Sequence, residues 1–254
     1  MFVPIADSNP LEHVRRPYVT FALILLNVFV FAVLQQGMGG EVSEAGVLAY
    51  GAIPAVVTGT AVLPPGYERI PAAFTLVTYM FLHGGWLHLI GNMAFLWVFA
   101  DNVEDALGHG RFLAFYLLCG VAAGLAHTAV QPDSEAPLVG ASGAVAGVIA
   151  AYLMLHPNIR LWALVLMKIP LRVPAYWAIV AWLAFQVWQV LADTEKDTAW
   201  WAHLGGFAAG AALVVVMRRR DVALLDRDPS GIPSPRRGPP VAGSGAGGDD
   251  EGRA

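Results

Sequence analysis

The chain has 254 residues, of which 57% are hydrophobic and only 13% charged, and its formal net charge is −4. Soluble domains usually carry about 25% charged residues, so this shortage of charge indicates a protein whose solvent is largely lipid. The negative balance, without a basic cluster interleaved with aromatic residues, argues against nucleic acid as a partner. The single cysteine, Cys119, excludes an intrachain disulfide and a zinc cage built from cysteines.

Six apolar segments predict membrane-spanning helices, because a spanning helix needs roughly 20 mainly apolar residues. After an N-terminal segment, residues 1–17, these spans cover about 18–34, 86–100, 112–130, 141–156, 176–191 and 200–217. A long loop rich in Gly and Pro, residues 35–74, is expected to lie partly in the membrane interface. The fold class expected is therefore an all-α membrane protein, with a six-helix bundle over residues 18–218. The tail, residues 219–254, has little apolar surface to bury, so we expect it to be disordered.

Positive charges set the expected orientation, because cytoplasmic loops carry an excess of Lys and Arg. With the N-terminus inside, the outer loops receive only Arg69 and Lys196. The inner side receives Arg15, Arg16, Arg111, Arg160, Lys168, Arg172, Arg218, Arg219 and Arg220. Both termini are therefore expected in the cytoplasm. The first span is not followed by a clear cleavage pattern for a signal peptide, and this favours a multi-pass protein of a bacterial inner membrane.

Polar residues inside spans are costly and point to function. In this orientation His88, Asn92, Ser142 and His203 all lie toward the outer ends of their spans, and His88 and Asn92 share a helical face. The span 141–156 is about 24 Å long against a hydrocarbon core of about 30 Å. Ser142, at its outer end, would therefore lie below the membrane surface.

Small residues accompany the polar ones. Gly143 and Gly147 form a stripe beside Ser142, and Gly206 and Gly210 form another beside His203. Such stripes allow helix backbones to approach closely. We therefore expect the fourth and sixth spans to pack together and to bring the serine hydroxyl to the imidazole.

This arrangement predicts nucleophilic catalysis. A serine hydroxyl becomes a good nucleophile when a base such as His203 takes its proton. Ser142 opens a helix, where unpaired amides favour negative charge and, with His88 and Asn92, could hold an oxyanion. Gly140 and Gly143 leave room for a substrate near the hydroxyl. Because no carboxylate is placed to orient the imidazole, we expect a Ser-His dyad that needs no metal or organic cofactor.

Taken singly, these residues also have structural interpretations. A lone serine in a membrane helix usually packs, a lone histidine near the interface often reaches toward water, and Asn92 could join two helices. The glycines, Gly206 and Gly210 included, serve packing. His127 has no partner that the sequence identifies, and we assign it to structure or to the outer edge of its span. A functional site is favoured because several polar residues from separate spans are expected at a similar depth in the membrane.

Three motifs resemble the rhomboid family of intramembrane serine proteases. They are HGGWLHLIGNM at 83–93, GASG at 140–143, and AHLGG at 202–206 followed by Gly210, within a similarity that covers about residues 10–218. The resemblance implies a six-helix core and cleavage of single-span membrane proteins near their membrane entry. It also implies Ser142 as nucleophile, His203 as base, and His88 with Asn92 as oxyanion donors. Glu104, in a further family-like pattern, Asn102-Val103-Glu104, would be structural.

Two positions depart from the family pattern. Many members carry Trp-Arg in the first loop, where this chain has Phe74-Thr75, and some carry a Tyr four residues after the nucleophile, where this chain has Ala146. Another side chain must therefore hold the imidazole. Neither departure removes a reacting group.

Two other classes of function remain open. A rhomboid-like protein that binds membrane helices without cleaving them would not need Ser142 and His203 together. A small transporter using His88 and His203 would be expected to show internal repeats, and no convincing repeat is present. Zinc proteases need a His-Glu-x-x-His helix, and aspartyl proteases need paired intramembrane Asp residues; the predicted spans contain neither.

Overall fold

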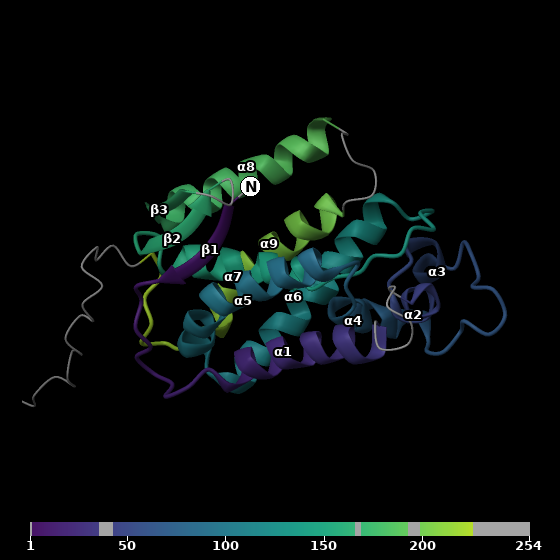
Figure 1. Cartoon of the computed structure of the whole chain (residues 1–254), viewed down its shortest axis with the longest axis horizontal. Coiled ribbons are helices and arrows are strands. Elements are labelled where there is room, and N and C mark those ends of the chain that lie inside the picture. Colours follow the sequence, from purple (N-terminus) through teal and green to yellow (C-terminus); the bar gives the residue numbers. More distant parts are fainter. Residues whose placement is uncertain (1, 36–42, 166–168, 193–198, 226–254) are drawn as a thin grey trace, which may run out of the picture.

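The computed structural model describes residues 2–35, 43–165, 169–192 and 199–225, and within these ranges the chain is mostly helical (Figure 1). The α-helices are α1 (Tyr18–Phe29), α2 (Glu44–Tyr50), α3 (Pro54–Thr58), α4 (Ala72–Thr78), α5 (Trp86–Leu107), α6 (His109–Val130), α7 (Ser142–Leu155), α8 (Ala175–Ala192) and α9 (Trp200–Met217). A π-helical turn, η1 (Val30–Gln35), extends α1, and a 3-10 turn, η2 (Tyr79–Phe81), extends α4.

Among the described residues, three helices are long and apolar enough to cross a membrane: Tyr18–Gln35, His109–Val130 and Trp200–Met217. A fourth crossing is available if the pair Ala72–Phe81 and Trp86–Leu107, bent by 82°, counts as one broken span. The three helices and Trp86–Leu107 fall on predicted spans, whereas Ala72–Phe81 lies outside them, and the apolar helices support an integral membrane protein. Helices α7 and α8 occupy the two remaining predicted segments, and six crossings stay a prediction.

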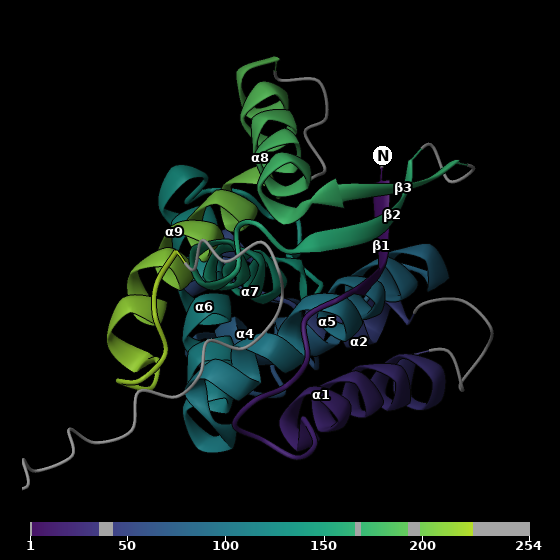
Figure 2. The same ribbon diagram turned by 90° about the vertical axis from the view of Figure 1, so that its left-hand side faces the viewer.

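Helix α7 lies at the centre of the bundle, packed against α5, α6 and α9 (Figure 2). It has 14 residues, and every one from Gly143 to Tyr152 is buried. Its small side chains, mostly Gly, Ala and Val, let the neighbouring helices approach on all sides. At 1.5 Å per residue its length is about 21 Å, so it is even shorter than the sequence predicted.

The segment predicted as a long loop, residues 35–74, contains the short helices α2 and α3 and the start of α4. Ser43 is the N-cap of α2, because its Oγ accepts a hydrogen bond from the Gly46 backbone N–H. Ala52, between α2 and α3, forms an isolated β-bridge with Leu138, which precedes α7. The loop was expected without helices, and these short ones lack the apolar periodicity that identifies longer helices.

A three-stranded sheet corrects the all-α prediction. Strands β1 (Phe2–Asp7), β2 (Arg160–Val165) and β3 (Ile169–Pro174) form an antiparallel sheet in the order β1-β2-β3. It covers the end of the bundle where α7 finishes and α8 begins (Figure 2). The N-terminal segment predicted at residues 1–17 therefore supplies a strand, and it pairs with residues far along the chain, as Ala6 does with Trp162, 156 positions away.

Two carboxylates at the same end of the bundle hold the N-terminal segment. Glu104, fully buried in α5, accepts hydrogen bonds from the backbone N–H groups of Val19 and Thr20 and from the Thr20 hydroxyl. It therefore caps the start of α1, and the prediction of a structural role for Glu104 is confirmed. Asp105 accepts from the backbone N–H groups of Glu12, His13 and Val14.

The predicted disordered tail lies mostly outside the described residues. Residues 219–225 are described, and they fold back on the bundle: the Arg219 backbone N–H donates to the Ala106 carbonyl, and that of Leu225 donates to the Met154 carbonyl. The remainder, 226–254, lies outside the described residues, as do Lys168 and Lys196, two of the residues used for the orientation.

Candidate active site

Ser142 and His203 meet at the end of the bundle opposite the sheet. Ser142 is the first residue of α7 and His203 lies in the first turn of α9. The Ser142 hydroxyl and the His203 Nε2 are 2.8 Å apart, although 61 residues separate them along the chain. A serine hydroxyl within hydrogen-bonding reach of an imidazole is the arrangement that a serine nucleophile and its general base require.

The other ring nitrogen of His203 contacts Gln186 of α8. His203 Nδ1 and Gln186 Oε1 are 3.1 Å apart, and the Gln186 side chain is buried. Because an amide oxygen only accepts hydrogen bonds, Nδ1 must carry the proton, which leaves Nε2 as the acceptor facing the Ser142 hydroxyl. Gln186 was not predicted, because it belongs to no motif and lies 17 residues from His203.

Two tryptophan rings border the imidazole of His203. The Trp200 ring lies 5.8 Å from it, nearly perpendicular at 81°, and the Trp182 ring lies 6.2 Å from it, tilted by 38°. Ala146, where some family members carry a Tyr, is fully buried in α7. The imidazole is therefore held by Gln186 and two indoles instead of a residue one turn after Ser142.

His88 and Asn92 lie against Gly140, two residues before Ser142. A Cβ placed on Gly140 would meet the His88 Nε2 at 2.6 Å and the Asn92 Nδ2 at 3.7 Å. Gly140 also has φ +118°, a conformation that side chains other than glycine's rarely adopt. Glycine at this position therefore lets both polar side chains reach the backbone that leads into α7.

Both side chains present donors toward Gly140. The Gly84 backbone N–H donates to His88 Nδ1 at 3.4 Å, so the proton of a neutral His88 belongs on Nε2, the nitrogen that faces Gly140. The Asn92 side chain is buried, and its Nδ2 has no hydrogen-bond partner within the described part of the chain. A buried amide nitrogen without a partner is uncommon, and it is the kind of group that could donate to a bound oxyanion.

The predicted glycine stripes form the contact between α7 and α9. A Cβ on Gly206 would lie 2.0 Å from the Gly143 carbonyl oxygen, and one on Gly210 would lie 2.2 Å from that of Gly147. No side chain fits at those separations without moving backbone. The four glycines thus set the helix separation that brings Ser142 to His203.

A hollow of about 460 Å³ opens beside the pair. Its polar lining includes His88, His127, Gln131, Ser134, Ser142 and His203. His127, predicted to be structural or to lie at the outer edge of its span, is buried at this wall, and its Nδ1 has no partner among the residues described. A hollow this polar suits water, which any hydrolysis consumes.

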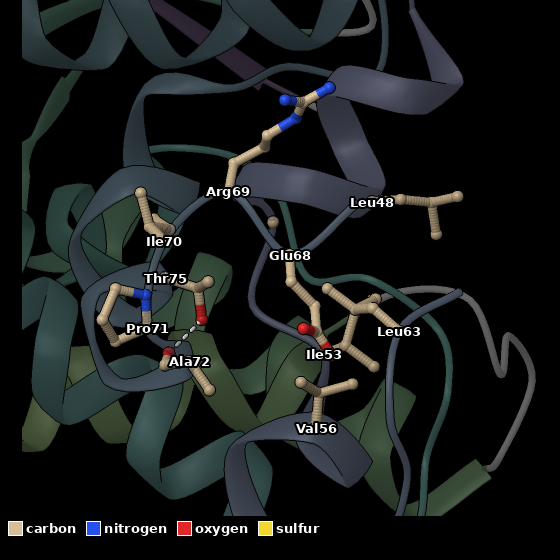
Figure 3. A pocket seen from close by; sticks show the side chains of 11 residues that line it. Leu48, Ile53, Val56, Leu63, Glu68, Arg69, Ile70, Pro71, Ala72 and Thr75 are labelled. Carbon is tan, nitrogen blue, oxygen red and sulfur yellow. Dashed lines mark hydrogen bonds between the residues drawn. The ribbon is translucent and has the colours of Figure 1, made fainter. Parts of the chain in front are cut away.

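A second hollow, of about 400 Å³, lies among α2, α3 and α4 (Figure 3). Leu63, Ile53 and Val56 line one side, the Glu68 side chain points toward them, and Arg69 points away (Figure 3). Thr75, one of the two residues where the family pattern differs, donates its hydroxyl to the Ala72 carbonyl at 2.6 Å. No serine or histidine is among the described residues that line this hollow, so it lacks the pair found at Ser142.

The chain is similar to a known protein family and to several known proteins. Residues 71–220 match the family model described as Rhomboid domain. The chain is 32% identical to RHOMBOID-like protein 5 of Arabidopsis thaliana over 57% of this chain and 44% of that protein. It is 31% identical to the rhomboid protease GluP of Bacillus subtilis over 54% of this chain and 24% of that protein. The chain therefore spans less than half the length of these curated relatives.

Proposed function

Because the chain belongs to the rhomboid family, we propose that this integral membrane protein is an intramembrane serine endopeptidase. The observation that carries the proposal is the hydrogen bond between the Ser142 hydroxyl and the His203 Nε2, 2.8 Å long, beside a polar hollow. The proposed substrates are single-span membrane proteins, cut near the outer membrane boundary.

The proposed reaction begins at the Ser142 hydroxyl. As Ser142 Oγ attacks the carbonyl carbon of the substrate, His203 Nε2 takes the hydroxyl proton. The carbonyl oxygen becomes negatively charged, and the Asn92 amide, the His88 Nε2–H and the backbone amides that open α7 are the donors available to it. His203 then gives its proton to the departing amine, and water from the hollow releases the acyl group by the same steps in reverse.

Gln186 has a positioning role in this proposal. During the attack the imidazole becomes positively charged, and a hydrogen bond from its Nδ1 to the Gln186 oxygen favours that charge. The same bond keeps Nε2 unprotonated and directed at Ser142 before the attack. A carboxylate would stabilise the charged imidazole more strongly, but burying a neutral amide costs much less desolvation free energy.

The proposed orientation puts both termini in the cytoplasm of a bacterial cell, with the protein in the inner membrane. The sheet end of the bundle then faces the cytoplasm, and Ser142 lies toward the outer surface. With α7 about 21 Å long, its hydroxyl would lie several Å below the opposite boundary of a hydrocarbon core about 30 Å thick. The Ser142 hydroxyl would then meet a substrate chain at the depth where that chain enters the membrane.

Covalent labelling tests the proposal. Three detergent-purified proteins are treated with a fluorophosphonate probe, which reacts with an activated serine. They are the wild type, Ser142→Ala and Ser134→Ala. Ser134 lines the same hollow, but its hydroxyl oxygen accepts a hydrogen bond from the Ala136 backbone N–H and is not paired with an imidazole among the hydrogen bonds of the described residues, so its replacement is the matched control. We expect label on wild type and Ser134→Ala and none on Ser142→Ala.

Cleavage of a single-span reporter in proteoliposomes completes the test. We expect Ser142→Ala and His203→Ala each to lose cleavage by at least about a thousandfold, with unchanged thermal unfolding. An unlabelled wild type that still binds the reporter would instead identify a protein that holds membrane helices without cutting them. Cleavage by the pure Ser142→Ala variant would rule out the assigned nucleophile.

A further inference from the structure

The face of the sheet turned away from the helices carries two arginines. In the register of β2 and β3, Arg160 pairs with Pro174 and Trp162 pairs with Arg172. Paired residues, and residues two apart on a strand, lie on the same face of a sheet. Arg160, Trp162 and Arg172 therefore share one face and are exposed, whereas Leu161, on the other face, is fully buried against the bundle.

No carboxylate balances these two guanidinium groups within the sheet. Its one acidic residue, Asp7, pairs with Leu161 and so lies on the inner face, where it accepts a hydrogen bond from the Tyr152 hydroxyl at 2.7 Å. Neither Arg160 nor Arg172 forms an ion pair with another residue in the described ranges. Two like charges at diagonal positions of a hairpin repel each other unless an anion lies near both.

A hollow of about 890 Å³ lies beside this pair. Its walls are Pro157, Asn158, Arg160, Arg172, Pro174, Tyr176 and Leu225. Tyr176 belongs to the first turn of α8, and its neighbour Trp177 is 65% exposed. Aromatic residues at the start of a membrane helix mark the level of the lipid headgroups. With α8 as the fifth predicted span, the hollow lies at that level.

We propose that Arg160 and Arg172 bind the phosphate of an anionic phospholipid headgroup in this hollow. Guanidinium groups suit the site because each can present two parallel N–H donors to phosphate oxygens. Trp162 and Tyr176 then lie at the depth of the glycerol, where amphipathic rings are stable. The inference rests on the proposed orientation, since the cytoplasmic leaflet holds the anionic lipids, but does not depend on the chemistry of Ser142.

Native mass spectrometry of the full chain, released from detergent with added lipid, tests the site. Phosphatidylglycerol is titrated against phosphatidylcholine with the same acyl chains. The variants are R160Q/R172Q and, as a matched control, R111Q/R220Q, which removes two exposed arginines at the same end of the bundle but outside the sheet. We expect wild type and the control to retain phosphatidylglycerol in preference, and R160Q/R172Q to bind it at least about tenfold more weakly.

Further arms separate the possible outcomes. R160K/R172K keeps the charge without the paired donors, so intermediate binding is expected, and it gives a second reading if the glutamine pair does not fold. Equal weakening by R111Q/R220Q would show that binding depends only on overall charge, and would overturn the proposal. Binding of glycerol 3-phosphate as tight as that of the lipid would identify a soluble phosphate site instead and would equally overturn it.

Fluorophosphonate labelling of the same samples keeps this inference apart from the proposed function. R160Q/R172Q is expected to label at Ser142 as wild type does, because the sheet and the Ser-His pair lie at opposite ends of α7. Loss of lipid selectivity with labelling intact supports the lipid site alone. A wild type that selects phosphatidylglycerol but takes no label would refute the protease and leave the lipid site standing.

Discussion

The two ends of the bundle differ in the hydrogen bonding of several buried polar side chains. At the sheet end, both carboxylate oxygens of Glu104 and of Asp105 accept hydrogen bonds from the protein. At the Ser142 end, Asn92 Nδ2 and His127 Nδ1 are buried without a partner in the described chain. Satisfied groups hold a structure together, whereas an unsatisfied donor costs stability that something else must justify. Glu104 and Asp105 therefore serve folding, whereas the unpaired Asn92 amide beside Ser142 is available to a ligand.

Among the variants that compare the two ends of the bundle, Asn92→Ala is expected to have the largest effect on turnover. Turnover should fall about 10²–10³-fold, because the variant loses one donor to the oxyanion. Thermal stability should barely change, because the lost Nδ2 has no partner. The measurements are reporter cleavage and the unfolding midpoint in detergent.

Asn102→Ala, in the same helix at the sheet end, is the control for Asn92. The Asn102 amide donates to the Asn9 carbonyl and to the Asp101 carboxylate, so its removal should lower the unfolding midpoint and leave turnover per folded molecule intact. Full turnover in Asn92→Ala would remove this residue from the proposed site and erase the contrast between the ends.

Glu104→Gln is expected to show the reverse pattern. Gln keeps the size of the side chain but turns one acceptor into an NH₂ that faces the N–H groups at the start of α1. A buried unsatisfied pair of this kind costs about 1–3 kcal/mol of stability. Glu68→Gln, at an exposed position, should leave the unfolding midpoint unchanged. If Glu104→Gln instead lost turnover without losing stability, the sheet end would have a direct catalytic role.

Gln186→Leu should weaken catalysis more mildly. The loss of one neutral hydrogen bond to the imidazole corresponds to about 1.4 kcal/mol, or roughly tenfold in turnover. Gln186→Glu keeps an oxygen acceptor in the same place and should recover most of the lost rate. Equal activity of the leucine variant and wild type would mean that the two tryptophan rings alone hold His203.

The smallest effect is expected at Asp7 and depends on pH. Burial raises the pKa of the Asp7 carboxyl, although the hydrogen bond from Tyr152 opposes this shift. The folded state therefore holds the proton more tightly than the unfolded state, and stability falls as pH rises from the unfolded pKa through the folded one. Asp7→Asn should unfold at a higher temperature than wild type at neutral pH, with the gain disappearing in acid. A gain that persists at acid pH would assign the effect to packing instead.

The sequence by itself determined the parts of this protein that depend on local pattern. Apolar runs predicted the long helices, because a spanning helix must be apolar over its whole length. The start of α5 at Trp86 and of α7 at Ser142 falls within one residue of the prediction. The glycine stripes predicted which helices approach each other, since only small residues permit contact at the distances observed.

Only the tertiary structure decided what depends on distant contacts. The strand Phe2–Asp7 has no apolar alternation of its own and becomes a strand by pairing with β2. Gln186 and His127 belong to no motif, and their place beside His203 follows from how α8 and α6 pack. Arg160 and Arg172 appear in the sequence as two separate inner-side charges, and the hairpin register puts them on one face. Local pattern fixes which segments are helical, but side chains from separate helices and strands meet only after packing has set their rotation and register.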